Sequence, residues 1–141
     1  MAVDHIVAIY IHRETFKPMI WGVNDCCLFI ANLAVELGFD DPAERFRNQY
    51  DDEVGAVRFV EEAGGIVRLI NQSLASVGIG KTKKPTNGDC GCVHVNDETM
   101  GAIYYADTWW IKANDGLIAC PPDEVRVLGV WQLSREEQCL Q

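Results

Sequence analysis

The chain has 141 residues, of which 48% are hydrophobic and 23% are charged, and its formal net charge at pH 7 is −9. This length and composition predict a single globular domain, with a core from about residue 18 to residue 133 and a flexible tail over residues 134–141. The negative charge repels phosphate backbones, which argues against a nucleic-acid partner, and no apolar run is long enough to span a bilayer.

The start of the chain lacks the basic and apolar regions of a signal peptide. We therefore expect synthesis in the cytoplasm, where the six cysteines stay reduced. The basic run formed by Lys81, Lys83 and Lys84 lies among Pro, Gly and Asn residues, which is typical of a solvated connector. His5 and His12 are expected at the surface, and no cofactor is expected.

The first half of the chain has the apolar spacing of helices. One helix is expected from Val3 to before Pro18. A second begins at Cys26, is capped by Asn24 or Asp25, and ends at Gly38. The apolar stripe of this second helix consists of Cys26, Phe29, Ile30, Leu33 and Leu37.

Three further helices are expected before residue 80. A short one follows Pro42, which suits a first helical position. The next is capped by Asp51 or Asp52 and ends at Gly64-Gly65, and the last covers residues 66–76.

The second half of the chain has the pattern of strands and turns. Strands are expected over residues 90–95, 99–105, 109–113, 117–119 and 125–133. Asn96-Asp97-Glu98 and Asn114-Asp115-Gly116 are the expected hairpin loops. Alternation places Trp109 and Trp110 on opposite faces of a strand. Helices followed by an antiparallel sheet predict an α+β domain in which the N-terminal helices pack on the C-terminal sheet.

Cys26 is the strongest candidate for a reactive group. A cysteine in the first turn of a helix lies near the positive end of the helix dipole, which favours the nucleophilic thiolate. The alternative is plain packing, because Cys26 belongs to the apolar stripe and free cysteine is often buried. Cys27 lies away from the centre of the stripe, and packing is its expected role.

The residues around Cys26 resemble a known family. Trp21-Gly22, Asp25-Cys26 and the apolar residues that follow are similar to the nucleophile helix of the NlpC-type cysteine peptidases, and Gly88-Asp89 resembles the start of their sheet. Within that superfamily the chain is most similar to a small branch of phage tail and prophage proteins. The likeness extends from Trp21 to Leu133. It implies a papain-like fold and a place in the virion tail tip, with other tail proteins as partners.

Two further positions of the family's site hold unexpected residues. In the active peptidases a histidine opens the second strand in a His-x-Gly-Ile-Tyr-like setting, and the matching stretch here begins at Met100. The polar residue that orients this histidine corresponds to Lys112. A thioether cannot accept a proton, so Met100 cannot serve as the base that activates Cys26.

His94 is the alternative base. If Asn96-Asp97-Glu98 closes a symmetric hairpin, His94 lies opposite Met100, with Cβ atoms ~4.5–5.5 Å apart. From there it would present its imidazole to Cys26. A register shift of one residue would turn His94 to the other face.

A metal site is the remaining hypothesis for this region. Cys90, Cys92 and His94 alternate along one expected strand and so share a face, where Cys26 would complete a soft-metal site. The spacing is atypical of zinc sites, so we expect small buried side chains and no bound metal.

These observations favour a degenerate peptidase that serves as a structural or assembly module of a phage tail. The alternative is an active cysteine hydrolase that cleaves the peptide stems of peptidoglycan, with Cys26 as nucleophile and His94 as base. A metal-binding module is a third, weaker hypothesis.

Overall fold

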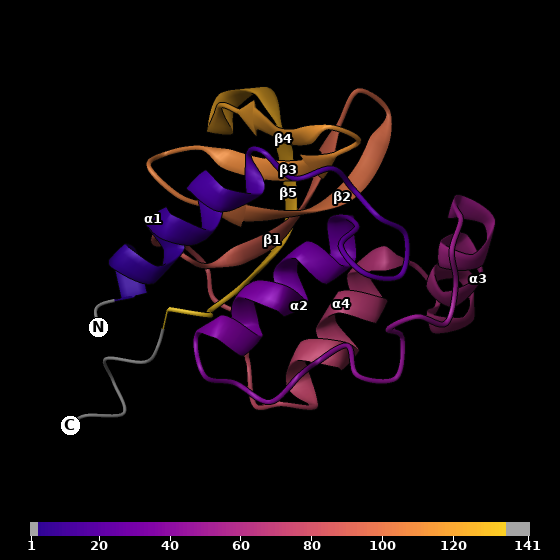
Figure 1. Ribbon diagram of the computed structural model, residues 1–141. Coiled ribbons are helices and arrows are strands. Elements are labelled where there is room, and N and C mark those ends of the chain that lie inside the picture. The colour runs from indigo at the N-terminus through magenta and orange to yellow at the C-terminus, as the bar shows by residue number, and fades with distance from the viewer. Residues whose placement is uncertain (1–2, 135–141) are drawn as a thin grey trace.

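The computed structural model describes residues 3–134 (Figure 1). The helices in this range are α1 (Val3–Glu14), α2 (Cys26–Glu36), α3 (Glu53–Ala63) and α4 (Ile66–Ala75). The strands are β1 (Cys90–Val95), β2 (Glu98–Tyr104), β3 (Trp109–Ala113), β4 (Gly116–Cys120) and β5 (Arg126–Trp131), and a short 3-10 helix, η1 (Pro122–Glu124), precedes β5. The predicted α+β class is confirmed. Residues 135–141 of the expected tail lie outside the described range.

The four helices begin and end close to their predicted positions. Asp25 caps α2, Asp52 caps α3, and Gly64 ends α3 in the left-handed conformation with φ 88°. The short helix predicted after Pro42 is wrong. Residues 42–48 form turns, and the chain leaves them through Asn48, whose positive φ of 61° does not fit a helix.

The five strands form one antiparallel sheet in the order β4-β3-β2-β1-β5. One face is covered by α1, α2 and α4 through a cluster that includes Phe29, Leu33, Cys92, Ile103 and Trp131. Figure 1 shows α2 and α4 below the sheet and α1 across its front. The predicted packing of the helices on the sheet is confirmed.

The other face of the sheet carries a second apolar cluster. It consists of Val93, Ala102, Trp109, Ile111, Cys120 and Val130. All five strands contribute to it. Trp109 belongs to this cluster and Trp110 packs against the helix-covered one, which confirms that the two tryptophans point to opposite faces.

The register of the β1–β2 hairpin differs from the expected one. The turn has two residues, Asn96 and Asp97, with φ of 52° and 63°, and Val95 pairs with Glu98. Asn and Asp adopt this left-handed conformation more readily than other residues with a side chain, so a tight turn forms without glycine. The expected three-residue loop is therefore wrong.

Helix α3 lies at the outer edge of the molecule (Figure 1) and buries none of its residues fully. Phe59 and Val60 connect it to a small cluster around Leu28 and Phe46, and it packs along α4. None of the helices between residues 3 and 134 has the length and apolar character that a membrane crossing requires.

Candidate functional site

Asp25 fixes the start of α2 and thereby the position of Cys26. Its carboxylate accepts hydrogen bonds from the backbone N–H groups of Cys27 and Leu28, at 3.2 and 3.0 Å. The N–H of Gly22 also donates to it, at 3.1 Å. The bonds from Cys27 and Leu28 satisfy backbone N–H groups that the first turn of a helix otherwise leaves unpaired. Asp25 is buried, while Cys26 is half-buried.

Tyr50 is a member of the site that sequence reasoning missed. Its hydroxyl donates to Asp25 Oδ2 at 2.5 Å, and burial and then this bond raise its pKa well above the usual value. A Cβ added at Gly22 would lie 2.1 Å from the Tyr50 carbonyl oxygen, so this close approach requires glycine. Tyr50 lies in an irregular segment, where apolar spacing gives no signal.

The first turn of α2 packs directly on β2. A Cβ added at Gly101 would lie 2.8 Å from Ile30 Cδ1 and 2.9 Å from the Cys26 carbonyl oxygen. The missing side chain of Gly101 is therefore what lets the helix approach the strand. Because the helix and the strand pack this closely, the backbone N–H of Gly101 donates to the Cys26 sulfur.

The environment of Cys26 favours its thiolate. The pKa of Cys26 is lowered, first by a hydrogen bond that the Cys27 thiol donates to its sulfur, and then by the N–H groups of Gly101 and of Cys26 itself. Burial and the charge of Asp25 oppose this shift. Conversely, the pKa of Cys27 is raised well above its usual value, first by donating that bond and then by burial. Cys27 thus also donates to Cys26, in addition to the packing that the sequence predicts.

Cys92 lies beside this pair on the helix-covered face of the sheet, opposite Gly101 in the β1–β2 register. Burial, followed by the proximity of Cys26, raises its pKa to about 12. Cys90 lies in the core, where burial raises its pKa well above the usual value. Within residues 3–134 no three His, Cys, Asp or Glu side chains are arranged to hold a metal ion.

His94 pairs with Thr99 and not, as predicted, with Met100. Its Nδ1 lies 2.8 Å from Thr99 Oγ1. Alternation along β1 puts His94 on the same face as Cys92. Among the described residues, however, the hydrogen bonds of the Cys26 sulfur involve thiol and backbone groups, and none involves an imidazole.

The register also changes which residue of β2 faces Cys26. Gly101 faces α2, and Thr99 shares that face because side chains alternate along a strand. Met100 alternates with these two residues and packs against the second cluster. The position that would offer a base to Cys26 from β2 is therefore that of Thr99.

Lys112, the residue at the expected orienting position, is buried and fully bonded. Its Nζ donates to the carbonyl of Lys17 at 2.7 Å, and to the carbonyl and Oε1 of Glu14 at 3.0 and 3.1 Å. Asn24 also donates to Glu14 Oε1, at 2.7 Å. Lys112 thus ties the end of α1 to the sheet, and its donors are turned away from Cys26.

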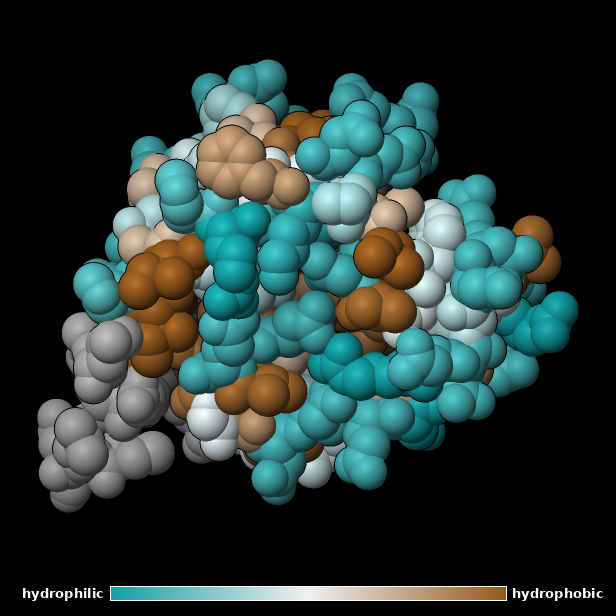
Figure 2. All heavy atoms as spheres, in the orientation of Figure 1, coloured by the Kyte–Doolittle hydropathy of each residue, from teal (hydrophilic) through white to brown (hydrophobic). Residues whose placement is uncertain are grey.

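A groove of about 740 Å³ passes over the start of α2, and we call it the central groove. Its walls include Trp21, Tyr50, Val57, Met100 and Ile118, and Cys26 and Cys27 lie along it. It separates α3 from the β1–β2 hairpin and the β3–β4 end of the sheet. Figure 2 shows the surface indented between the hairpin and α3, with hydrophobic side chains exposed nearby.

The remaining candidates lie away from the groove. His5 and His12 are exposed, as predicted, and the His12 ring contacts Phe16 edge-on at 5.4 Å. Lys81, Lys83 and Lys84 are also exposed, and Lys81 lies over the ring of Trp131.

The chain belongs to a family described as a domain of unknown function, DUF6950, whose model matches residues 3–132. No curated protein and no solved structure matches the chain. In this chain the family's domain is an α+β fold with a cysteine of lowered pKa at a helix start, beside an open groove.

Proposed function

We propose that this protein is a phage or prophage tail component that uses a degenerate NlpC-type, papain-like fold for assembly at the tail tip. The observation that carries the proposal is Cys26. It lies at the start of α2, where the resemblance expects the nucleophile, yet no imidazole among residues 3–134 is hydrogen-bonded to its sulfur. Without a base to take up and return a proton, the leaving amine of a peptide bond is not protonated.

Two neighbouring positions support the same proposal. Thr99 on β2 shares the face of Gly101, and Lys112 on β3 holds the position that the resemblance gives to the orienting residue. Neither is suited to serve as a base or to orient one, because a hydroxyl is a poor base at neutral pH and the Lys112 ammonium is committed to Glu14 and Lys17. The virion tail as the place of action follows from the resemblance alone.

An active cysteine hydrolase acting on peptidoglycan is the second candidate. Three features favour it: the lowered pKa of Cys26, its partial exposure in the groove, and the position of His94 on the same sheet face as Cys92. For catalysis the His94 ring would have to leave Thr99 and reach the sulfur.

Digestion of purified peptidoglycan distinguishes the two candidates. Wild-type protein and the Cys26→Ser and His94→Ala variants would be incubated with it, and soluble stem peptides measured by mass spectrometry. The proposed assembly role predicts no release by any of the three. Release by the wild type that is lost in both variants would replace it with the hydrolase.

A further inference from the structure

The central groove has the features of a binding site for an extended peptide. Its volume of about 740 Å³ lies within the range of ligand pockets. Val57 on α3 and Ile118 on β4 are exposed although both line it. Apolar side chains that remain in contact with water along a groove are stabilised when a partner covers them.

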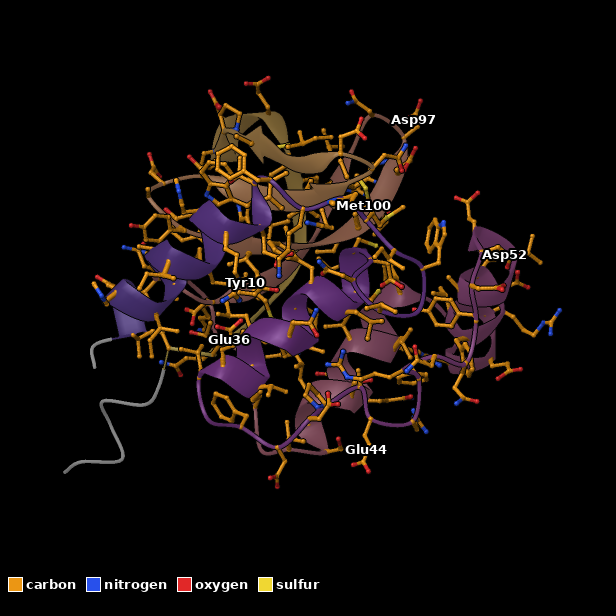
Figure 3. All side chains as sticks on the ribbon, viewed as in Figure 1. Tyr10, Glu36, Glu44, Asp52, Asp97 and Met100 are labelled. Carbon is orange, nitrogen blue, oxygen red and sulfur yellow. The ribbon has the colours of Figure 1, made fainter. Side chains whose placement is uncertain are left out.

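The opening of the groove is acidic on both sides. Glu53 at the start of α3 and Glu98 at the start of β2 line it and are exposed. Asp52 and Asp97 lie next to them in the chain, and Figure 3 shows Asp97 at the β1–β2 hairpin and Asp52 at α3.

No free cation lies among the described residues that line the groove. Lys112 is the only lysine or arginine there, and Glu14 and Lys17 occupy its donors. The net charge of −9 adds to the negative potential and disfavours a second copy of this chain as the occupant. The groove therefore combines apolar walls with an opening that attracts positive charge.

We propose that the central groove binds an extended segment of a partner protein in which apolar side chains alternate with lysine or arginine. The apolar side chains would pack against the walls, and the basic ones would reach Glu53 and Glu98. The inference deepens the proposed assembly role, since it names the chemistry of the partner. It rests on that role, because an active hydrolase would cleave the bound segment.

Two synthetic hexapeptides of matched length test the charge preference. One alternates leucine with lysine and the other alternates leucine with glutamate. Binding would be measured by fluorescence anisotropy, and occupancy of the groove by protection of Cys26 from iodoacetamide. We expect the basic peptide to bind at least about tenfold more tightly and to protect Cys26, with a preference that shrinks at about 1 M NaCl.

A pair of double variants tests the position of the charges. Glu53→Gln with Glu98→Gln should weaken binding of the basic peptide by about three- to tenfold, since exposed ion pairs are individually modest. Glu61→Gln with Glu62→Gln removes the same number of exposed charges from α3 outside the groove and should change binding by less than about twofold.

The outcomes separate this inference from the proposed function. Equal binding of both peptides, failure of the basic peptide to protect Cys26, equal effects of the two double variants, or dimerisation that shields Cys26 would each overturn the inference and leave the assembly role untouched. Cysteine-dependent digestion of peptidoglycan would overturn the assembly role, while the measured charge preference of the groove would stand.

Discussion

The lowered pKa of Cys26 depends first on the thiol of Cys27, so Cys27→Ala should make Cys26 less reactive at neutral pH. Hydrogen bonds to charged groups are worth ~1.5–3 kcal/mol, and thiols are weak donors, so we take the lower end. This corresponds to an upward shift of about one pKa unit. The thiolate is favoured above the pKa, so the labelling curve should move to higher pH and the rate near pH 7 should fall about tenfold.

Iodoacetamide labelling between about pH 5 and pH 10, with quantification of the Cys26 peptide by mass spectrometry, measures this shift. Peptide mapping is needed because the chain has six cysteines. Cys92→Ala is the matched control, since it removes a neighbouring thiol that does not donate to Cys26, and its curve should move by less than about 0.3 unit. An unchanged or lower midpoint in Cys27→Ala would refute the role assigned to the Cys27 thiol.

Two further predictions concern the contacts that hold the site. Lys112→Met should lower the free energy of unfolding by about 3–5 kcal/mol in urea denaturation, because it leaves the Glu14 carboxylate buried without its main partner. Adding Glu14→Gln should restore part of the loss, and a single-variant cost under about 1 kcal/mol would contradict the buried pair. Tyr50→Phe should cost about 1–2 kcal/mol in the same assay, since the Asp25 carboxylate loses a donor, and no measurable loss would show that the 2.5 Å bond does not form.

Features of the site that depend on neighbouring residues could be predicted from the sequence. The start of α2 at Cys26 is one of them, because Asp25 caps the backbone groups two and three residues further on. The turn of the β1–β2 hairpin is also local, but Asn96 and Asp97 permit more than one loop length. The tighter turn changed the partner of His94 by one residue.

Other features depend on residues that are far apart in the chain. Tyr50 reaches Asp25 across 25 positions, and Lys112 reaches Glu14 across 98. No periodic pattern specifies such pairs, because they depend on how the elements pack. The resemblance to the NlpC-type peptidases has the same weakness, since it predicts Met100 at the histidine position while the strand turns Thr99 toward α2.

A pair of histidine substitutions on β2 tests whether a base would reach Cys26 from the face of this strand that carries Thr99 and Gly101. Thr99 and Gly101 share a face, and Gly101 contacts the first turn of α2, so an imidazole at position 99 lies one pleat, ~6.6 Å along the strand, from the Cys26 contact. Thr99→His should therefore lower the midpoint of Cys26 labelling by about one unit or more, because an imidazolium stabilises a nearby thiolate. Met100→His carries the same group at the alternate position, which packs against the second cluster although it also lines the central groove, and should move the midpoint by less than about 0.3 unit. A shift in Met100→His without one in Thr99→His would mean that β2 presents its other face to Cys26. That result would also refute the assignment of position 99 as the place from which a base on β2 would reach Cys26.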